Sequence, residues 1–330
     1  MEKLYQVKNL KKYYPIKKSL FGANKYLKAV DDVSFDIYKG ETFGLVGESG
    51  SGKSTIGKCL TKIEEISDGE ILYKDKSIIK SDDKTIKDFR NNIQAIFQDP
   101  YSSLNPTLNI FEIIAEPIRS QEKLTENQIK EKVASLMEKV GISADYMEKK
   151  PREFSGGQRQ RISIARAIST NPEFILCDEP ISALDVSIQA QIVNLLEDIQ
   201  KDLGITYLFI AHDLAMVEHI SDRIGVLYMG HLVEIGDSRQ IYKNPKHPYT
   251  IGLLNSILDP RPRRDKTKPL KTISSDIPSP IDLPKGCIFQ TRCPYKTDGC
   301  QTESPQLEEF ENGHKIACFN AGKIYDYQIN

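Results

Sequence analysis

A glycine-rich loop between a short apolar strand and a helix constrains this chain more than any other feature of its sequence. The loop has the letters GESGSGKS and runs from Gly47 to Ser54. It follows the apolar run 42–46 and opens a segment in which Ile56 and Leu60 recur at helical spacing. Glycines let a backbone wrap around phosphate groups, and the free N–H groups at a helix start attract anions. The sequence therefore predicts a phosphate-binding loop.

The side chains of this loop have distinct predicted roles. Lys53 is expected to reach the β- and γ-phosphate oxygens of a nucleoside triphosphate, and the Ser54 hydroxyl to ligate Mg²⁺. A glycine-rich turn that binds nothing is the alternative, but strand, loop, Lys-Ser pair and helix all occur in register. The predicted nucleotide-binding residues here are Gly47, Glu48, Ser49, Gly50, Ser51, Gly52, Lys53, Ser54 and Thr55.

Two carboxylates follow a second apolar strand, at 173–177. The carboxyl ends of strands form the ligand-binding edge of an α/β sheet. We therefore predict that Asp178 holds Mg²⁺ through water, and that Glu179 orients and deprotonates an attacking water molecule. An acidic surface pair with no chemical role is the alternative, and the phosphate loop argues against it.

Short apolar runs alternate with amphipathic helices along the chain, which is typical of an α/β domain with a largely parallel sheet. The expected strands lie at 42–46, 93–97, 173–177, 206–210 and 224–228. Upstream, residues 5–10 and 30–37 alternate apolar and polar side chains, which predicts an antiparallel sheet near the N-terminus.

Strand patterns are missing between about residues 99 and 160, where a helical insertion is expected. Thr125 and Gln128 have the spacing of a capping box, and Gly141 marks the end of the helix that they begin. A second long helix is expected after Ser187, ending at Gly204.

Charge and hydropathy limit where such a protein works. The 45 basic and 46 acidic residues nearly cancel, so no net field directs the chain to nucleic acid or an anionic bilayer. No apolar stretch approaches the ~20 residues that span a membrane. The first residues have no apolar core like that of a signal peptide. We expect a cytoplasmic protein whose contact with a membrane comes through its partners.

Four of the six cysteines crowd into the end of the chain, at Cys287, Cys293, Cys300 and Cys318. Disulfides are rare in cytoplasmic proteins. The spacing C-x5-C-x6-C-x17-C matches neither the usual zinc pairs nor the common ferredoxin pattern. A short segment with little apolar content needs some means of packing, which favours bound metal, with iron–sulfur, zinc and free thiols as the alternatives.

The letters SGGQRQR at 155–161 resemble the signature sequence of ABC ATPases, and other motifs follow in that family's order. Gln98 resembles its Q-loop glutamine, SALD at 182–185 its D-loop, and His212 its switch histidine. Tyr14, or its neighbour Tyr13, resembles the aromatic residue that stacks on adenine. The resemblance covers about residues 1–260 and implies a P-loop NTPase core that hydrolyses ATP, with an N-terminal antiparallel β-subdomain and an inserted α-helical subdomain.

The resemblance also assigns roles to residues. It implies that Glu179, His212 and Gln98 are catalytic, and that Ser54, Gln98 and Asp178 hold Mg²⁺. It further implies that one group of residues contacts the ATP of a facing subunit, namely Ser155, Gly156, Gly157, Gln158 and Asp185. A capping box at Ser155 and Gln158 agrees with this role, because a helix N-terminus offers N–H groups to phosphate.

Flanking segments are similar to the ATPases of oligopeptide and dipeptide importers, and in particular to the F-type of the two that such importers pair. These segments are FQDPYSSLNP at 97–106, NPKHPYT at 244–250 and GCIFQTRC at 286–293. The resemblance implies import of short peptides with a homologous second ATPase, two permeases and an extracytoplasmic peptide-binding protein, on the cytoplasmic face of the membrane. It also favours a [4Fe-4S] cluster in a C-terminal extension at 261–330.

Other functions remain open at this stage. Nickel importers of the same group use similar ATPases, so the cargo is less constrained than the ATPase. A soluble ABC ATPase acting on chromosomes would need a long coiled coil after Gln98, and one acting on ribosomes would need two ATPase cassettes. An inactive paralogue would need a damaged Glu179, Gln158 or His212, and all three are intact. We therefore expect no nucleic-acid partner.

Overall fold

The structure of the protein, a computed structural model, describes residues 2–17, 25–212, 214–256 and 278–323. The chain divides into two compact units. The helical unit comprises Met1–Tyr5, Ile37–Thr42 and Leu72–Ile210, and the phosphate-loop unit comprises Gln6–Asp36, Phe43–Ile71 and Ala211–Asn330.

Parallel strands form the centre of the helical unit. β7 (Phe174–Asp178) pairs with β6 (Ile93–Ile96) on one side and β8 (Thr206–Ala211) on the other, so that Cys177 lies between Ile96 and Phe209. Every residue of β7 and β8 is buried, which explains why both have the continuous apolar sequences of central parallel strands. β5 (Lys76–Ser77) pairs antiparallel with the end of β4 (Asp68–Tyr73).

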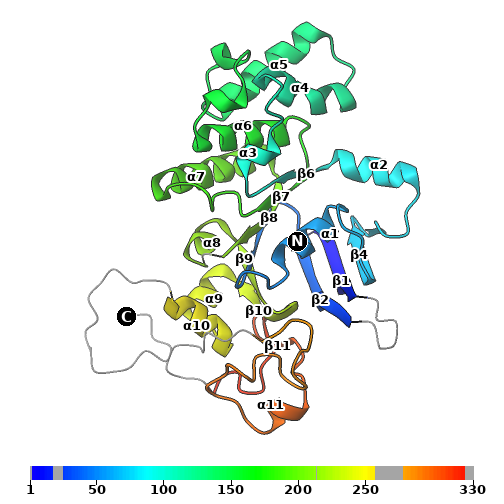
Figure 1. The fold of residues 1–330 in the computed structure, drawn as a ribbon, viewed down its shortest axis with the longest axis vertical. Coiled ribbons are helices and arrows are strands. Elements are labelled where there is room, and N and C mark those ends of the chain that lie inside the picture. The colour runs from blue at the N-terminus through cyan, green and yellow to red at the C-terminus, as the bar shows by residue number, and fades with distance from the viewer. Residues whose placement is uncertain (1, 18–24, 213, 257–277, 324–330) are drawn as a thin grey trace. The chain divides into compact units, whose positions relative to one another are not determined.

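Most of the rest of this unit is helical, and Figure 1 shows α3, α4, α5 and α7 gathered around α6, with α2 apart from them. α6 contacts α3, α4, α5 and α7, and α2 contacts β6. The α5 helix begins at the predicted capping box, in which Thr125 and Gln128 bond reciprocally, and it buries Ile129, Val133 and Met137. The helices and 3-10 turns are α2 (Asp83–Asn91), α3 (Pro100–Ser103), α4 (Ile110–Gln121), α5 (Glu126–Lys139), η1 (Ala144–Tyr146), η2 (Pro151–Glu153), α6 (Gly156–Ile168) and α7 (Val186–Leu203).

In the phosphate-loop unit, β3 (Thr42–Val46) pairs in parallel with β9 (Arg223–Tyr228), and β10 (His231–Asp237) pairs antiparallel with β9. A hairpin of β11 (Glu308–Glu311) and β12 (His314–Ile316) continues this sheet, because β12 pairs with β10. Sequence reasoning missed this hairpin. All four β11 residues, EEFE, are exposed, so the strand shows no apolar alternation.

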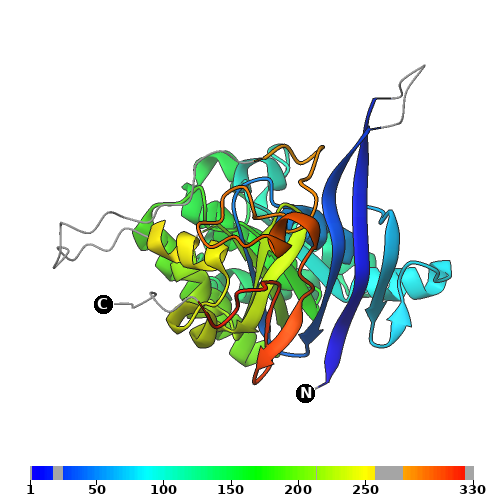
Figure 2. The same ribbon diagram turned by 90° about the horizontal axis from the view of Figure 1, so that it is seen from below.

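A second sheet has the order β2-β1-β4-β5, and its two long members are β1 (Lys3–Lys17) and β2 (Lys25–Tyr38). Figure 2 shows β1 and β2 side by side. They contain the predicted segments 5–10 and 30–37. The remaining helices of the phosphate-loop unit are α1 (Lys53–Leu60), α8 (Leu214–Ile220), α9 (Ser238–Lys243), α10 (Pro248–Ser256) and α11 (Gly299–Thr302).

The predicted α/β fold is confirmed, and each expected core strand lies within one residue of an observed one. The helical insertion is also confirmed, with α3 to α5 and both 3-10 turns inside the predicted range 99–160. The predicted boundary between residues 260 and 275 lies outside the described residues, and the two domain ranges stay a prediction. No helix in the described part of the chain has the length and apolar character needed to cross a membrane.

Candidate nucleotide-binding site

Backbone geometry explains the glycines of the phosphate loop. Gly47, Gly50 and Gly52 have φ values of 154°, 77° and 105°, which side chains rarely tolerate. A Cβ atom at Gly52 would lie 2.2 Å from the Ala29 carbonyl oxygen, and one at Gly47 would lie 2.1 Å from the carbonyl oxygen of Leu227. Only glycine fits at these two positions, because the neighbouring backbone leaves no room for a side chain.

Lys53 lies within the loop that it is predicted to serve. It is 4% exposed, and its ammonium donates to the carbonyl oxygens of Gly47 at 2.7 Å and Glu48 at 3.0 Å. The buried Ser51 hydroxyl has no hydrogen-bond partner among the described residues, while the Ser51 carbonyl accepts from Gly230 N–H at 2.8 Å. A buried cation and an unsatisfied hydroxyl in a glycine loop fit the oxygens of a phosphate chain.

The Glu48 side chain is held by a residue that sequence reasoning missed. Arg292 makes two bonds to its carboxylate, at 2.8 and 2.9 Å, and the Tyr249 hydroxyl accepts from the Glu48 N–H at 2.8 Å. Arg292 lies 244 positions along the chain, within the cysteine-containing segment, and no local pattern marks it. A single arginine that far away could not be paired with the loop by spacing alone.

The two adenine-stacking candidates differ in their contacts. The Tyr13 hydroxyl donates to the Asp31 carboxylate, and the Lys28 ammonium lies 5.4 Å from the centre of the Tyr13 ring. The Lys12 ammonium lies 4.8 Å from the centre of the Tyr14 ring. The Tyr13 hydroxyl is engaged by Asp31, and Tyr14 remains the predicted stacking residue.

In the helical unit, the structure brings two of the predicted catalytic residues together. The Gln98 side-chain amide donates to the Glu179 carboxylate at 2.9 Å. Glu179 has a φ of 48°, and its N–H donates to the Ile210 carbonyl at 3.0 Å. Asp178 is 7% exposed at the end of β7. A left-handed backbone is uncommon at a non-glycine residue, and here it occurs directly after Asp178, the last residue of β7.

The signature segment begins α6 as predicted. Ser155 is the N-cap residue, and it forms a complete capping box with Gln158. A Cβ atom at Gly157 would lie 2.6 Å from Ile188 Cγ2 of α7, so this glycine also allows two helices to approach closely. Asp185 caps α7 without a side-chain bond to the helix, and it is exposed. The N–H groups at the start of α6 are thus presented by an ordered, capped helix end.

His212 lies at a bend directly after β8, and its residue is exposed. It belongs to the phosphate-loop unit, whereas Gln98 and Glu179 belong to the helical unit. Its place after a core strand agrees with the predicted position, and its role as a switch residue stays a prediction.

The structure does not support the predicted metal site in the tail. Within the described residues, which include all four tail cysteines, no group of three or more His, Cys, Asp or Glu side chains is arranged to hold a metal ion. The premise that this segment lacks other means of packing was wrong. Phe289 is 1% exposed among Tyr228, Tyr249 and His247, at ring distances of 5.2, 5.5 and 5.6 Å.

Backbone pairing and a buried polar contact also hold the tail. β12 adds to β10, and the imidazole Nε2 of His314 lies 2.7 Å from the Glu234 carboxylate, with both side chains fully buried. Glu234 also accepts from the N–H groups of Lys246 and His247, at 2.7 and 3.1 Å. The segment therefore folds onto the sheet through its own side chains.

The four thiols are nevertheless neighbours. The Cys287 N–H donates to the Cys300 carbonyl at 2.9 Å. Burial, and to a smaller extent the other three cysteines, raise the pKa of Cys318 to about 12. Burial likewise raises the pKa of Cys293 to about 11, with Cys287 and Cys300 adding to the effect. Backbone N–H groups of Asn320 and Tyr295 oppose these shifts by bonding to the sulfurs of Cys318 and Cys293.

Together, the phosphate loop on a parallel-stranded sheet, the acidic pair after β7 and the capped signature helix define an ABC-type ATPase. Comparison with known families agrees. Residues 30–182 match the family described as ABC transporter, and residues 233–300 match the oligopeptide/dipeptide transporter C-terminal region.

Curated relatives match nearly the whole chain. The oligopeptide transport ATP-binding protein OppF of Haemophilus influenzae is 49% identical over 321 residues, which cover 96% of this chain and 97% of the relative. The dipeptide transport ATP-binding protein DppF of the same organism is 48% identical over 313 residues, covering 94% of each. The chain belongs to the family of ATP-binding subunits of oligopeptide and dipeptide ABC transporters.

Solved structures share the fold. The dimeric bacterial ABC transporter cassette MJ0796 has a TM-score of 0.64 at 26% identity, covering 71% of this chain and 99% of the cassette. The cbiO1 protein of Clostridium perfringens, part of an ABC transporter complex, has a TM-score of 0.63 at 27% identity. The match covers 74% of this chain and 92% of cbiO1. The chain is thus an ABC ATPase in fold as well as in sequence.

Proposed function

We propose that this ATPase powers the import of short peptides across the cytoplasmic membrane, from the cytoplasmic face. The match of residues 233–300 to the C-terminal region of oligopeptide and dipeptide transporters carries the proposal, because this match lies outside the matched ABC transporter region 30–182. Relatives named for oligopeptide and dipeptide transport cover nearly the whole chain and support the same cargo class.

The roles of individual residues follow from the chemistry of phosphoryl transfer. Lys53 and the N–H groups of Gly47–Ser54 would bind the β- and γ-phosphates, and Ser54, Gln98 and Asp178 would hold Mg²⁺, which neutralises charge on the phosphate oxygens. Glu179 would accept a proton from the attacking water, with its carboxylate held by Gln98 until then. His212 would contact the γ-phosphate, and Tyr14 would stack on adenine.

The capped N-terminus of α6 supports a role for a facing subunit. Ser155, Gly156, Gly157 and Gln158, with Asp185, would contact the ATP held by that subunit's phosphate loop. The expected assembly contains a homologous second ATPase, two permease subunits and an extracytoplasmic peptide-binding protein. ABC transporter membership implies permease partners, and the composition of the assembly belongs to the proposal.

We also propose that Cys287, Cys293, Cys300 and Cys318 hold a [4Fe-4S] cluster. Backbone N–H···S bonds at Cys293 and Cys318 support it, because hydrogen-bond donors stabilise thiolate ligands. Anaerobically purified protein should then be brown, with about four iron atoms and four sulfides per chain. Cys293→Ser should remove most of the colour. A colourless anaerobic preparation, with or without zinc, would contradict the cluster.

Peptide uptake tests the proposed function. Cells that lack this gene should lose ATP-dependent uptake of labelled dipeptides or oligopeptides, and the wild-type gene should restore it. The matched control is Glu179→Gln, which removes a proton acceptor while keeping the size of the side chain. Uptake restored equally by wild type and Glu179→Gln would contradict the catalytic role of Glu179, and uptake unaffected by the deletion would contradict peptide import.

A further inference from the structure

We propose that Arg292 is a positioning residue for ATP binding, which holds the phosphate loop in shape by its grip on Glu48. The proposal concerns the ATP-binding step itself and does not depend on the transported cargo. Arg292 lies in the tail segment and directly precedes Cys293, whereas Glu48 is the second residue of the loop. Both belong to the phosphate-loop unit.

The geometry of the pair is that of a strong contact. The two guanidinium nitrogens of Arg292 lie 2.8 and 2.9 Å from the two carboxylate oxygens of Glu48, a bidentate arrangement. The Arg292 side chain is 5% exposed and that of Glu48 is 28% exposed, so water screens the contact weakly. The guanidinium also lies 5.6 Å from the centre of the Tyr228 ring. The buried guanidinium therefore contacts both the Glu48 carboxylate and the Tyr228 ring, which restrict its movement.

Glu48 is fixed through its backbone as well. Its N–H donates to the Tyr249 hydroxyl at 2.8 Å, and its carbonyl accepts from the Lys53 ammonium at 3.0 Å. Tyr249 and Tyr228 pack together with ring centres 4.7 Å apart, and both contact Phe289 of the tail. The side chain, N–H and carbonyl of one loop residue are therefore all held, and two of its three anchors rest on the same aromatic cluster.

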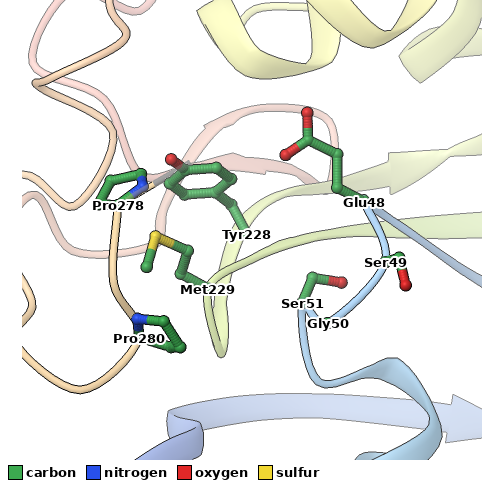
Figure 3. A pocket seen from close by; sticks show the side chains of 8 residues that line it. All are labelled: Glu48, Ser49, Gly50, Ser51, Tyr228, Met229, Pro278 and Pro280. Carbon is green, nitrogen blue, oxygen red and sulfur yellow. The ribbon is translucent and has the colours of Figure 1, made fainter. Parts of the chain in front are cut away.

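The tail approaches the loop at a second place. Pro278 and Pro280 line a cavity of about 210 Å³ together with loop residues 48–51, Tyr228 and Met229. Figure 3 shows the two prolines on one side of this cavity and the loop on the other. The loop thus has open space beside it on the side of the tail prolines. On this side of the loop, the Arg292–Glu48 ion pair gives the tail a direct bond to the loop.

An ordered loop binds phosphate more tightly than a mobile one, because its N–H groups need no rearrangement when the anion arrives. Loss of Arg292 frees the Glu48 side chain and lets the loop occupy other conformations. ATP would then bind only the fraction of molecules whose loop keeps the binding conformation. Its apparent affinity would fall in proportion to that fraction. The chemistry of hydrolysis should be less affected, since Arg292 is placed to act on the loop alone.

The test is a double-mutant cycle read by ATP affinity. Arg292→Met should weaken ATP binding by about tenfold, within the usual range of coupling between neighbouring sites. Glu48→Gln should weaken it to a similar extent, and the double variant should be no worse than either single one. Arg292→Lys keeps the charge but loses the bidentate geometry, so it should recover only part of the affinity. Lys285→Met removes a positive charge from an exposed residue of the same segment and should leave affinity unchanged.

Steady-state kinetics separate positioning from a merely structural role. In Arg292→Met the KM for ATP should rise about tenfold while kcat at saturating ATP changes less than about twofold. A lowered melting temperature with wild-type ATP affinity would overturn the proposal, as would additive losses in the double variant. If Arg292→Met does not fold, Glu48→Gln and Arg292→Lys test the proposal instead. Wild-type ATP affinity in both of these variants would overturn the proposal. Peptide uptake is not part of this test, so its outcome is independent of the proposed cargo.

Discussion

At the scale of single residues, hydrogen bonds hold both the side chain and the backbone of Glu179, the residue proposed as the catalytic base. Gln98 donates to Glu179 at 2.9 Å, and the left-handed backbone of Glu179 is fixed by its bond to Ile210. A general base must be free to accept a proton, so the Gln98 amide has to share or release this carboxylate during turnover.

Replacing Glu179 by Gln tests this role. ATP binding should persist, because the phosphate loop is untouched, while the hydrolysis rate should fall by roughly 10²–10⁴-fold, as expected when a positioned base is lost. Single-turnover hydrolysis and equilibrium ATP binding measure the two effects separately. Wild-type turnover in this variant would show that another group takes the proton.

Replacing Lys53 by Ala tests the phosphate loop. The substitution removes a buried ammonium that holds the carbonyls of Gly47 and Glu48, and that is placed to bind phosphate. ATP affinity should fall by at least about tenfold, because a charge-assisted contact in a buried site is lost. Lys58→Ala, in the last turn of the same helix, is the matched control. Equal ATP affinity in both variants would count against this loop as the nucleotide site.

At the scale of secondary-structure elements, the sequence predicted the features that depend on neighbouring residues, namely helix starts and buried strands. The capping boxes at Thr125 and Ser155 marked the starts of α5 and α6, and the apolar runs marked the buried strands. The β11–β12 hairpin was missed because its partner, β10, is remote in sequence, and the pairing uses backbone groups that no residue pattern reveals. The Arg292–Glu48 pair was missed because its two residues are 244 positions apart in the sequence.

His247 joins several of these elements, and its titration should be visible in stability. Its Nδ1 accepts from the Tyr249 N–H at 3.1 Å at the start of α10, so the folded protein requires the neutral imidazole. Burial lowers the pKa of His247 from 6.5 to about 4, and Glu234 opposes the shift only in part. Between these two pH values the unfolded chain binds more protons than the folded one, so stability falls as the pH falls.

The free energy of unfolding should therefore lose about 3 kcal/mol from this residue as the pH drops from above 6.5 to below 4, at about 1.4 kcal/mol for each pKa unit. His247→Asn retains an acceptor near the position of Nδ1 but does not titrate. Denaturant unfolding at several pH values should show a smaller acid loss in this variant than in the wild type. The same pH dependence in both proteins would show that His247 is not the responsible group.

At the scale of the whole molecule, the chain has two elements with a predicted role in nucleotide binding, and their expected targets differ. The phosphate loop is proposed to bind the chain's own ATP, and the start of α6 to contact the ATP of a facing subunit. The ABC transporter cassette MJ0796, which shares this fold, has been solved as a dimer. One chain then contributes half of each of two sites.

Assembly should consequently control the rate of hydrolysis. Alone and dilute, the chain should be largely monomeric and hydrolyse ATP slowly, because each site needs Ser155 and Gln158 from a second chain. Its specific activity should rise with protein concentration, and rise further when the homologous ATPase and the permeases are added.

Glu179→Gln should keep ATP bound and so favour the dimer, which analytical ultracentrifugation with and without ATP would detect. Ser155→Arg, which places a bulky side chain at the start of α6, should abolish this dimer while leaving ATP binding by the monomer intact. Full specific activity that is independent of concentration, or an unchanged dimer in Ser155→Arg, would contradict the shared site.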